Sequence, residues 1–238
     1  GPMSEVTDLT KQVRENFLEA NSAANIEITG EDKLAKMSGK LSAIKLGYET
    51  ISDTLTDYNV KLNGITDATE LNSEAVKMQD EIQSRISSSK QLESDTLNAV
   101  AEQQQKLVQL ENLRATVPSG SEKYEELTEK INQSNITLIK QETNLDAIKS
   151  QQTALQGISD GYLETLKQQS ASSSDMNELI QLRRRMYRDE IDMSKTQVDI
   201  LNQQQGKINE LGTGLDNYVK KFGPLNDALM NSFDAMGD

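Results

Sequence analysis

Apolar residues recur every seven positions along much of the chain, at two positions of each heptad. In the first long stretch, one position holds Leu34, Leu41, Tyr48, Leu55 and Leu62, and the position three residues later holds Met37, Ile44, Ile51, Tyr58 and Ile65. Two apolar residues per heptad form a narrow stripe on an α-helix, which is typical of a coiled-coil seam that buries one facing helix. The pattern therefore predicts a long helix in this stretch.

A turn is expected at residues 117–120, where Pro118 disfavours helix for the preceding residue and Gly120 accepts unusual backbone angles. Ser119 and Glu122 have the spacing of a capping box, so Ser119 is expected to start the next helix. Heptad spacing continues on both sides of this turn. The sequence thus predicts a helical hairpin whose tip is the turn.

The heptad pattern weakens near residues 63–73 and 157–175. In an antiparallel hairpin closed at residues 117–120, facing residues have numbers that add up to about 235 to 240, so these two hinges would coincide in space. The hairpin either stays open, about 130 Å long, or folds back at the hinges into a shorter four-helix bundle of about 75 Å. Narrow seams favour the open form, because four-helix bundles usually need a wider apolar face. The fold class is all-α, as an elongated antiparallel coiled-coil hairpin or a long helical bundle.

The long-helix body is expected to span residues 29–222. Asp175 and Glu178 have capping spacing at the start of its last helix, and Gly223-Pro224 is expected to stop that helix. The tail, residues 223–238, then follows as a short amphipathic piece that needs a groove to bury its stripe. It folds back onto its own bundle, or docks on a partner or a neighbouring copy through Leu225, Leu229, Phe233 and Met236.

An N-terminal amphipathic segment, residues 1–28, precedes the body. Val6, Leu9, Val13 and Phe17 share one helical face. Charges of both signs are roughly balanced on its polar face, whereas helices that lie on membranes are usually rich in Lys and Arg. We expect this segment to dock on the body.

Composition narrows the range of functions. Among 238 residues, 38 acidic and 25 basic side chains give a formal charge of -13, and hydrophobic residues are 35%. Such a charge repels phosphate backbones, so no nucleic-acid partner is expected. There is no Cys or His, so no imidazole or thiolate metal site, disulfide or usual acid–base dyad is available. We expect no enzyme activity and no cofactor.

The basic cluster comprises Arg183, Arg184, Arg185 and Arg188. It is either a site for a phosphate-bearing partner or a solvated helix face whose charges pair with nearby acids, and the second interpretation is favoured.

No stretch is apolar enough to span a membrane, and the start of the chain lacks a signal peptide's regions. The expected location is the cytoplasm, or outside the cell by a route without a cleaved signal peptide.

Three long helices behind an amphipathic segment resemble BAR-type membrane-bending modules, but the acidic charge does not suit a concave lipid-binding face. Residues 107–155 are also similar to the coiled-coil parts of bacterial secretion-system translocators and phage tape-measure proteins. Many unrelated coiled coils share this second likeness, so no family is assigned.

Two functions follow from these patterns. The favoured one is a non-enzymatic, elongated coiled-coil scaffold or assembly subunit that acts through protein–protein contacts, including self-association. The alternative is a membrane-acting helical bundle, either a translocator or toxin-like protein or a BAR-like membrane bender.

Overall fold

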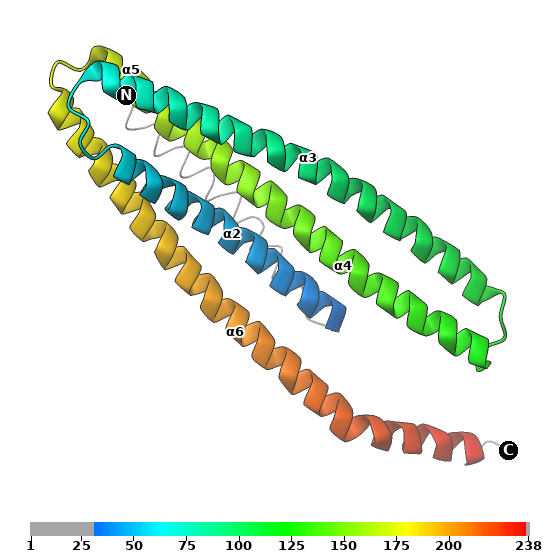
Figure 1. The fold of residues 1–238 in the computed structure, drawn as a ribbon. Coiled ribbons are helices and arrows are strands. Elements are labelled where there is room, and N and C mark those ends of the chain that lie inside the picture. Colours follow the sequence, from blue (N-terminus) through cyan, green and yellow to red (C-terminus); the bar gives the residue numbers. More distant parts are fainter. Residues whose placement is uncertain (1–30, 237–238) are drawn as a thin grey trace.

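The computed structural model describes the backbone of residues 31–236 and the side chains of residues 33–214 (Figure 1). Its long helices are α2 (Glu31–Lys61), α3 (Ala68–Ala115), α4 (Glu122–Gly157) and α6 (Met176–Met236). A π-helical turn, η2 (Ile158–Leu163), and the short helix α5 (Glu164–Ser172) connect α4 to α6. The described residues form helices and connections only, which confirms the all-α fold class.

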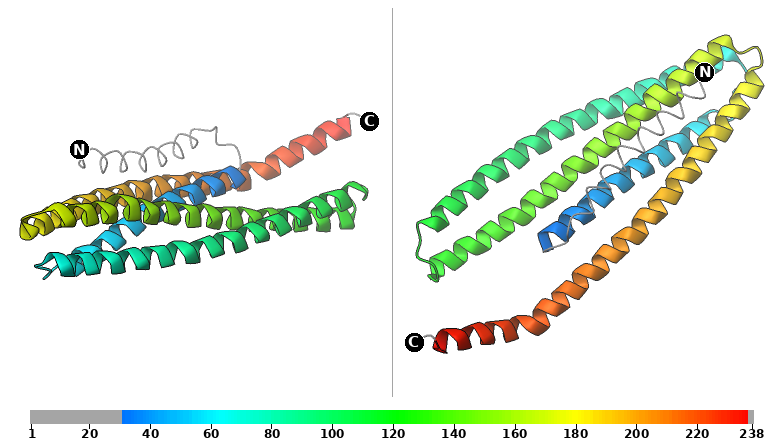
Figure 2. Two further views of the ribbon diagram at one scale, coloured as in Figure 1. Left: turned by 90° about the horizontal axis from the view of Figure 1, so that it is seen from above. Right: turned by 180° about the vertical axis from the view of Figure 1, so that it is seen from behind.

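The hairpin folds back on itself. Helix α3 packs on α4 and α2 packs on α6, and α2 also packs on α4. The helices therefore lie side by side in the order α3, α4, α2, α6 (Figures 1 and 2). Breaks at residues 62–67 and 173–175 meet at one end of the molecule, which we call the closed end. The folded-back bundle is thus the observed form, and the preference for the open hairpin was wrong.

The reason is a second face on α2 that is made of small residues. Gly39, Ala43, Gly47, Thr50 and Thr54 are buried and fall three or four positions apart, so they share one side of the helix. Gly39 lies directly against Thr143 of α4, and Lys36 forms an ion pair with Glu142 at 4.0 Å. Small side chains allow two helices to approach closely without large apolar residues. An analysis of Leu, Ile and Val spacing does not detect such a face.

Most of the apolar core lies at the closed end. One cluster there draws on α2, α3, α4, η2, α5 and α6 and includes Leu55, Leu62, Leu71, Met78, Ile82, Leu155, Leu163, Leu166 and Tyr187. A second, smaller cluster joins α2 to α6 and contains Leu34, Leu41, Ile44, Leu201 and Ile208. The first cluster fixes all the long helices to one another, and the second holds only the α2·α6 pair.

Helix ends follow the turn chemistry, with one shift. Gly120 has a positive φ of 82°, a conformation that suits glycine, and the chain turns there as expected. The cap of α4 is Ser121 rather than Ser119, because the Ser121 hydroxyl accepts a hydrogen bond from the Tyr124 amide at 3.2 Å. Asp175 caps α6 as predicted, accepting from the Glu178 amide at 3.0 Å.

Helix α6 does not stop at residue 222. It continues through Gly223-Pro224 to Met236, so the prediction that these two residues stop the helix was wrong. A proline inside a helix removes one backbone hydrogen bond and often kinks the helix without ending it. The orange-to-red part of α6 bends in Figure 1 and continues beyond the first residue of α2.

We expect Gly39→Leu to lower the free energy of unfolding by about 1 to 3 kcal/mol, because the new side chain overpacks the contact between α2 and Thr143. Gly206 on α6 is the matched control, since a side chain there meets no neighbour within 4 Å. Gly206→Leu should stabilise by up to about 1 kcal/mol through helix propensity. Urea unfolding of both variants checks this. Equal effects at the two positions would contradict the close approach of α2 and α4.

Candidate functional site

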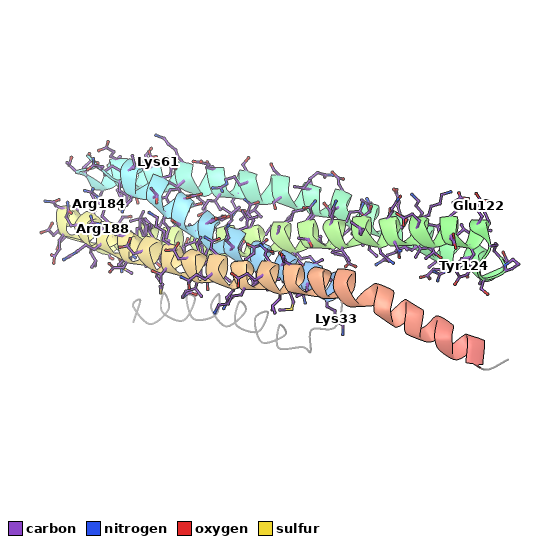
Figure 3. All side chains as sticks on the ribbon, turned by 90° about the horizontal axis from the view of Figure 1, so that it is seen from below. Lys33, Lys61, Glu122, Tyr124, Arg184 and Arg188 are labelled. Atoms are coloured by element: carbon purple, nitrogen blue, oxygen red, sulfur yellow. The ribbon has the colours of Figure 1, made fainter. Side chains whose placement is uncertain are left out.

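The basic cluster does not form one surface patch. Arg183 is 1% exposed and Arg184 is half-buried, whereas Arg185 and Arg188 are exposed. Figure 3 shows Arg184 and Arg188 near Lys61 at the closed end, away from Tyr124 at the hairpin tip. Only two of the four predicted arginines can therefore present their charge fully to a partner.

Arg183 is held inside the core by polar and polarisable groups. One of its Nη atoms donates a hydrogen bond to Oε1 of Gln169 on α5, and the other lies 3.7 Å from the Met186 sulfur. Among the described residues, no carboxylate forms an ion pair with this guanidinium. Burial lowers the pKa of Arg183, while the neighbouring Tyr187 and Tyr162 act in the opposite direction. The side chain ties α5 to α6 and bears a desolvation cost.

Two tyrosines pack beside this arginine. The rings of Tyr162 and Tyr187 meet edge to face with centroids 5.5 Å apart. The Tyr187 hydroxyl is buried and has no hydrogen-bond partner among the described residues. Burial raises the pKa of Tyr187 to about 12, and the nearby Arg183 opposes that rise. The two rings therefore pack against each other. The buried Tyr187 hydroxyl lowers stability, because it lost its hydrogen bonds to water without gaining a partner among the described residues.

Polar contacts also pin α2 to α3 at the closed end. The Tyr58 hydroxyl donates to the Met78 carbonyl at 3.2 Å, and burial raises the pKa of Tyr58. Lys61 bridges Asp57 at 2.8 Å and Glu81 at 2.9 Å, and hydrogen bonds to both carboxylates raise its pKa. These contacts cross between helices whose backbones stay apart, so they fix the angle at which the hairpin folds back.

Further polar contacts at the closed end join side chains of different helices. Gln79 donates to the Ser159 hydroxyl at 2.6 Å and Arg85 donates to the Thr54 hydroxyl at 3.2 Å. Among the described residues, no group of three or more His, Cys, Asp or Glu is arranged to hold a metal ion. The two hydrogen bonds connect α3 to η2 and α3 to α2.

The opposite end of the molecule offers a different kind of surface, which we call the hairpin arm, residues 97–136. Glu142 and Thr143 lie level with the first turns of α2, so most of the arm extends beyond that helix (Figure 1). Its own seam is buried between α3 and α4 and consists of Val100, Leu107, Leu127 and Ile131. Gln103 adds a hydrogen bond to the Ser134 carbonyl at 3.1 Å. The arm therefore holds itself together.

Large apolar side chains remain outside this seam. Val108 is 55% exposed, Leu113 49% and Ile136 51%, and Leu97 is also exposed. At the tip, the Arg114 guanidinium lies 5.7 Å from the centre of the Tyr124 ring. The hairpin arm thus presents apolar and aromatic groups on a self-supporting two-helix unit, which suits contact with another protein surface.

The predicted tail residues Leu225, Leu229, Phe233 and Met236 belong to the distal part of α6, but their side chains lie outside the described residues. The N-terminal segment, residues 1–28, also lies outside them. The burial of Arg183 was not predicted, although Ile180, Arg183, Tyr187 and Ile191 share one helical face, and that spacing was the available signal.

Comparison with known families, curated proteins and solved structures finds no match for this chain. The candidate surfaces therefore rest on the geometry of the chain alone.

The raised pKa of Tyr187 predicts that the free energy of unfolding falls at high pH. Its pKa is about 12 in the folded state and about 10 in an unfolded chain, so the unfolded state releases the proton first. The stabilisation is complete below about pH 10 and disappears as the pH rises to about 12, a change of roughly 2 to 3 kcal/mol. We expect Tyr187→Phe to remove much of this alkaline loss, measured by urea unfolding at about pH 8 and pH 11.5.

Tyr58→Phe is the comparison. It should cost about 1 kcal/mol already at pH 8, because it breaks the hydrogen bond to Met78. Tyr187→Phe should be nearly neutral at pH 8, since its hydroxyl has no partner among the described residues. A large loss for Tyr187→Phe at pH 8 would contradict the observed packing.

Proposed function

We propose that the protein is a non-enzymatic helical scaffold that binds other proteins through the hairpin arm. The observation that supports this most directly is the separation of the molecule into two parts. The apolar core is concentrated at the closed end, while the hairpin arm extends from it with its own buried seam and exposed apolar side chains. A rigid base and a protruding unit are the features that a spacing and docking protein needs.

The extent of the surface supports the same proposal. The chain exposes 14685 Å², whereas a compact protein of its mass would expose about 10,600 Å². A large surface for a given mass is poorly suited to enclosing a substrate and well suited to contacting several partners. Self-association of the arms is part of the proposal, because exposed apolar patches often mark interfaces between proteins.

Membranes and nucleic acids are less suitable partners. The net charge is -13, and Arg185 and Arg188 are the exposed arginines of the basic cluster. No helix within the described residues is long and apolar enough to cross a membrane. The charge distribution thus favours a protein partner over a phosphate-bearing surface.

The test compares two matched double variants. The arm variant carries Val108→Ser and Leu113→Ser. The control carries Val60→Ser and Val76→Ser, which removes two apolar side chains near the closed end that are at least as exposed as Leu113. We expect the arm variant to reduce partner capture and self-association by about tenfold or more, because truncating central apolar contacts costs over 1 kcal/mol. Affinity capture and sedimentation velocity measure the two effects.

Equal losses in the arm variant and the control would contradict a role for the hairpin arm. The membrane alternative is tested separately by co-sedimentation with anionic vesicles. Salt-sensitive binding that disappears in the double variant Arg185→Glu, Arg188→Glu would overturn the proposal in favour of a membrane-acting protein.

A further inference from the structure

One exposed side of α3 in the hairpin arm carries almost no charge. Six of its residues recur three, four or seven positions apart, so they lie on one side of the helix, and all six are exposed. We call them the neutral strip: Ser94, Leu97, Ala101, Gln104, Val108 and Ala115. Three exposed amide residues border the strip at every seventh position: Asn98, Gln105 and Asn112. Helix α3 lies at one edge of the packed helices in Figure 1, and no other described helix covers this side.

The other exposed side of α3 carries the charges. They are Asp95, Glu102 and Lys106. Leu92 and Leu113 share that side with them, and these two leucines are 54% and 49% exposed, against 45% for Leu97 and 55% for Val108 on the strip. The two sides therefore expose their large apolar residues to a similar degree, and the lack of charge distinguishes the neutral strip.

The outward side of α4 in the same arm is also charged. Glu126 forms ion pairs with Lys123 at 2.9 Å and with Lys130. Charged residues make up 26% of the chain, yet the neutral strip runs without one of them along about 32 Å of helix. Charged residues are depleted at the centre of protein interfaces. The strip thus has the composition of an interface on a surface that is otherwise charged.

The charge of the protein favours a second copy as the occupant of the strip. Each copy carries a formal charge of -13, so two copies repel one another wherever their acidic faces meet. An uncharged face is the part of the surface on which they can approach closely. A basic partner, in contrast, would bind more favourably to the acidic faces than to the strip.

The strip is also complementary to itself when two copies run antiparallel. If facing residues have numbers that add up to 205, Leu97 faces Val108 of the second copy and Ala101 faces Gln104. Each of these contacts occurs twice, as twofold symmetry requires. The two large apolar residues of the strip then cover each other, and the small Ala101 leaves room for the longer Gln104.

The direction of pairing follows from Glu111, the charged residue that falls between Val108 and Ala115 in the same row. A parallel pair would set the two Glu111 carboxylates side by side. In the antiparallel pair Glu111 faces Ser94, whose hydroxyl can donate a hydrogen bond to the carboxylate, and the two Glu111 residues lie about 25 Å apart along the helix.

The same register avoids collisions between the two bodies. It places residue 90 level with residue 115 of the second copy, so only the hairpin arms overlap. The closed ends then lie at opposite ends of the pair, because each body extends away from its own arm (Figure 2).

We infer that two copies of the chain pair antiparallel through the neutral strips of their hairpin arms. The inference rests on the proposed role of the hairpin arm and specifies one partner of that arm. The strip and its bordering amides contribute fewer residues than the roughly 20 to 30 a side of a stable interface, so the dimer should be weak, with a dissociation constant on the order of micromolar. Such a pair forms where the protein is locally concentrated.

Disulfide trapping tests the register, because the chain has no cysteine of its own. The single variants Leu97→Cys and Val108→Cys are mixed in equal amounts and oxidised, and mass spectrometry separates the three possible dimers. We expect the mixed dimer to form about tenfold faster or more than either symmetric dimer. Only the mixed pair comes within disulfide range, since the two copies of residue 97 lie about 16 Å apart along the helix.

The matched control pair is Leu92→Cys mixed with Leu113→Cys. These positions also add up to 205 and are similarly exposed, but they lie on the charged side of α3. A control pair that crosslinks as fast as the strip pair would overturn the inference. Faster formation of either symmetric dimer from the strip variants would also overturn it, because it would place the strips in another alignment.

Sedimentation equilibrium gives a second measurement without cysteines. Val108→Glu should weaken the dimer by about tenfold or more, because it buries an unpaired charge against Leu97, whereas Leu113→Glu adds the same charge on the other side and should change the dissociation constant less than about twofold. Raising NaCl from about 50 mM to about 500 mM should strengthen the wild-type dimer, since salt screens the repulsion between acidic copies. Weakening by salt would contradict pairing through an uncharged face.

These results separate the inference from the proposed function. If Val108→Glu leaves self-association intact while the variant Val108→Ser, Leu113→Ser still loses capture of other proteins, the pairing is wrong and the docking role of the hairpin arm stands. If the strip pair crosslinks as expected but that double variant captures other proteins normally, the arm serves self-association and the broader docking role is wrong.

Discussion

The contact between α2 and α4 determines the rest of the structure, because it joins the α3·α4 pair to the α2·α6 pair. Large apolar residues on α2 are already committed to α6 and the closed-end core. The second face of α2 therefore consists of Gly39, Ala43, Gly47 and threonines, and it gains stability from close approach and dispersion rather than from large buried side chains. This allows a chain with 35% hydrophobic residues to fold back into a bundle.

The closed end shows the cost of concentrating the core. Arg183 is buried without an ion pair to any described carboxylate, and the Tyr187 hydroxyl beside it has no partner among those residues. Replacing buried charges by apolar groups of similar volume is often neutral or stabilising. The burial of Arg183 therefore does not by itself raise the free energy of unfolding. Arg183 instead ties α5 to α6 through Gln169, and Lys61 ties α2 to α3 through Glu81. Such directional contacts fix how the arms leave the core.

Much of the fold could be predicted from heptad spacing and turn residues. The seam residues Leu41, Ile44 and Leu201 form one cluster, and Asp175 is a cap, because large apolar residues and capping residues act locally. The folded-back form could not be predicted, since small residues carry no hydrophobic signal and their packing depends on Thr143, about 100 positions away. The site was predicted only in part: the arginines were found, but the burial of Arg183 depends on α5 and Gln169.

The hairpin arm is stabilised by contacts between its own two helices, and this decides what it can offer a partner. The hairpin arm contains both of its helices, so Leu107 and Leu127 are buried in its own seam and Val108 stays exposed. A surface that is free in the resting protein therefore belongs to the hairpin arm.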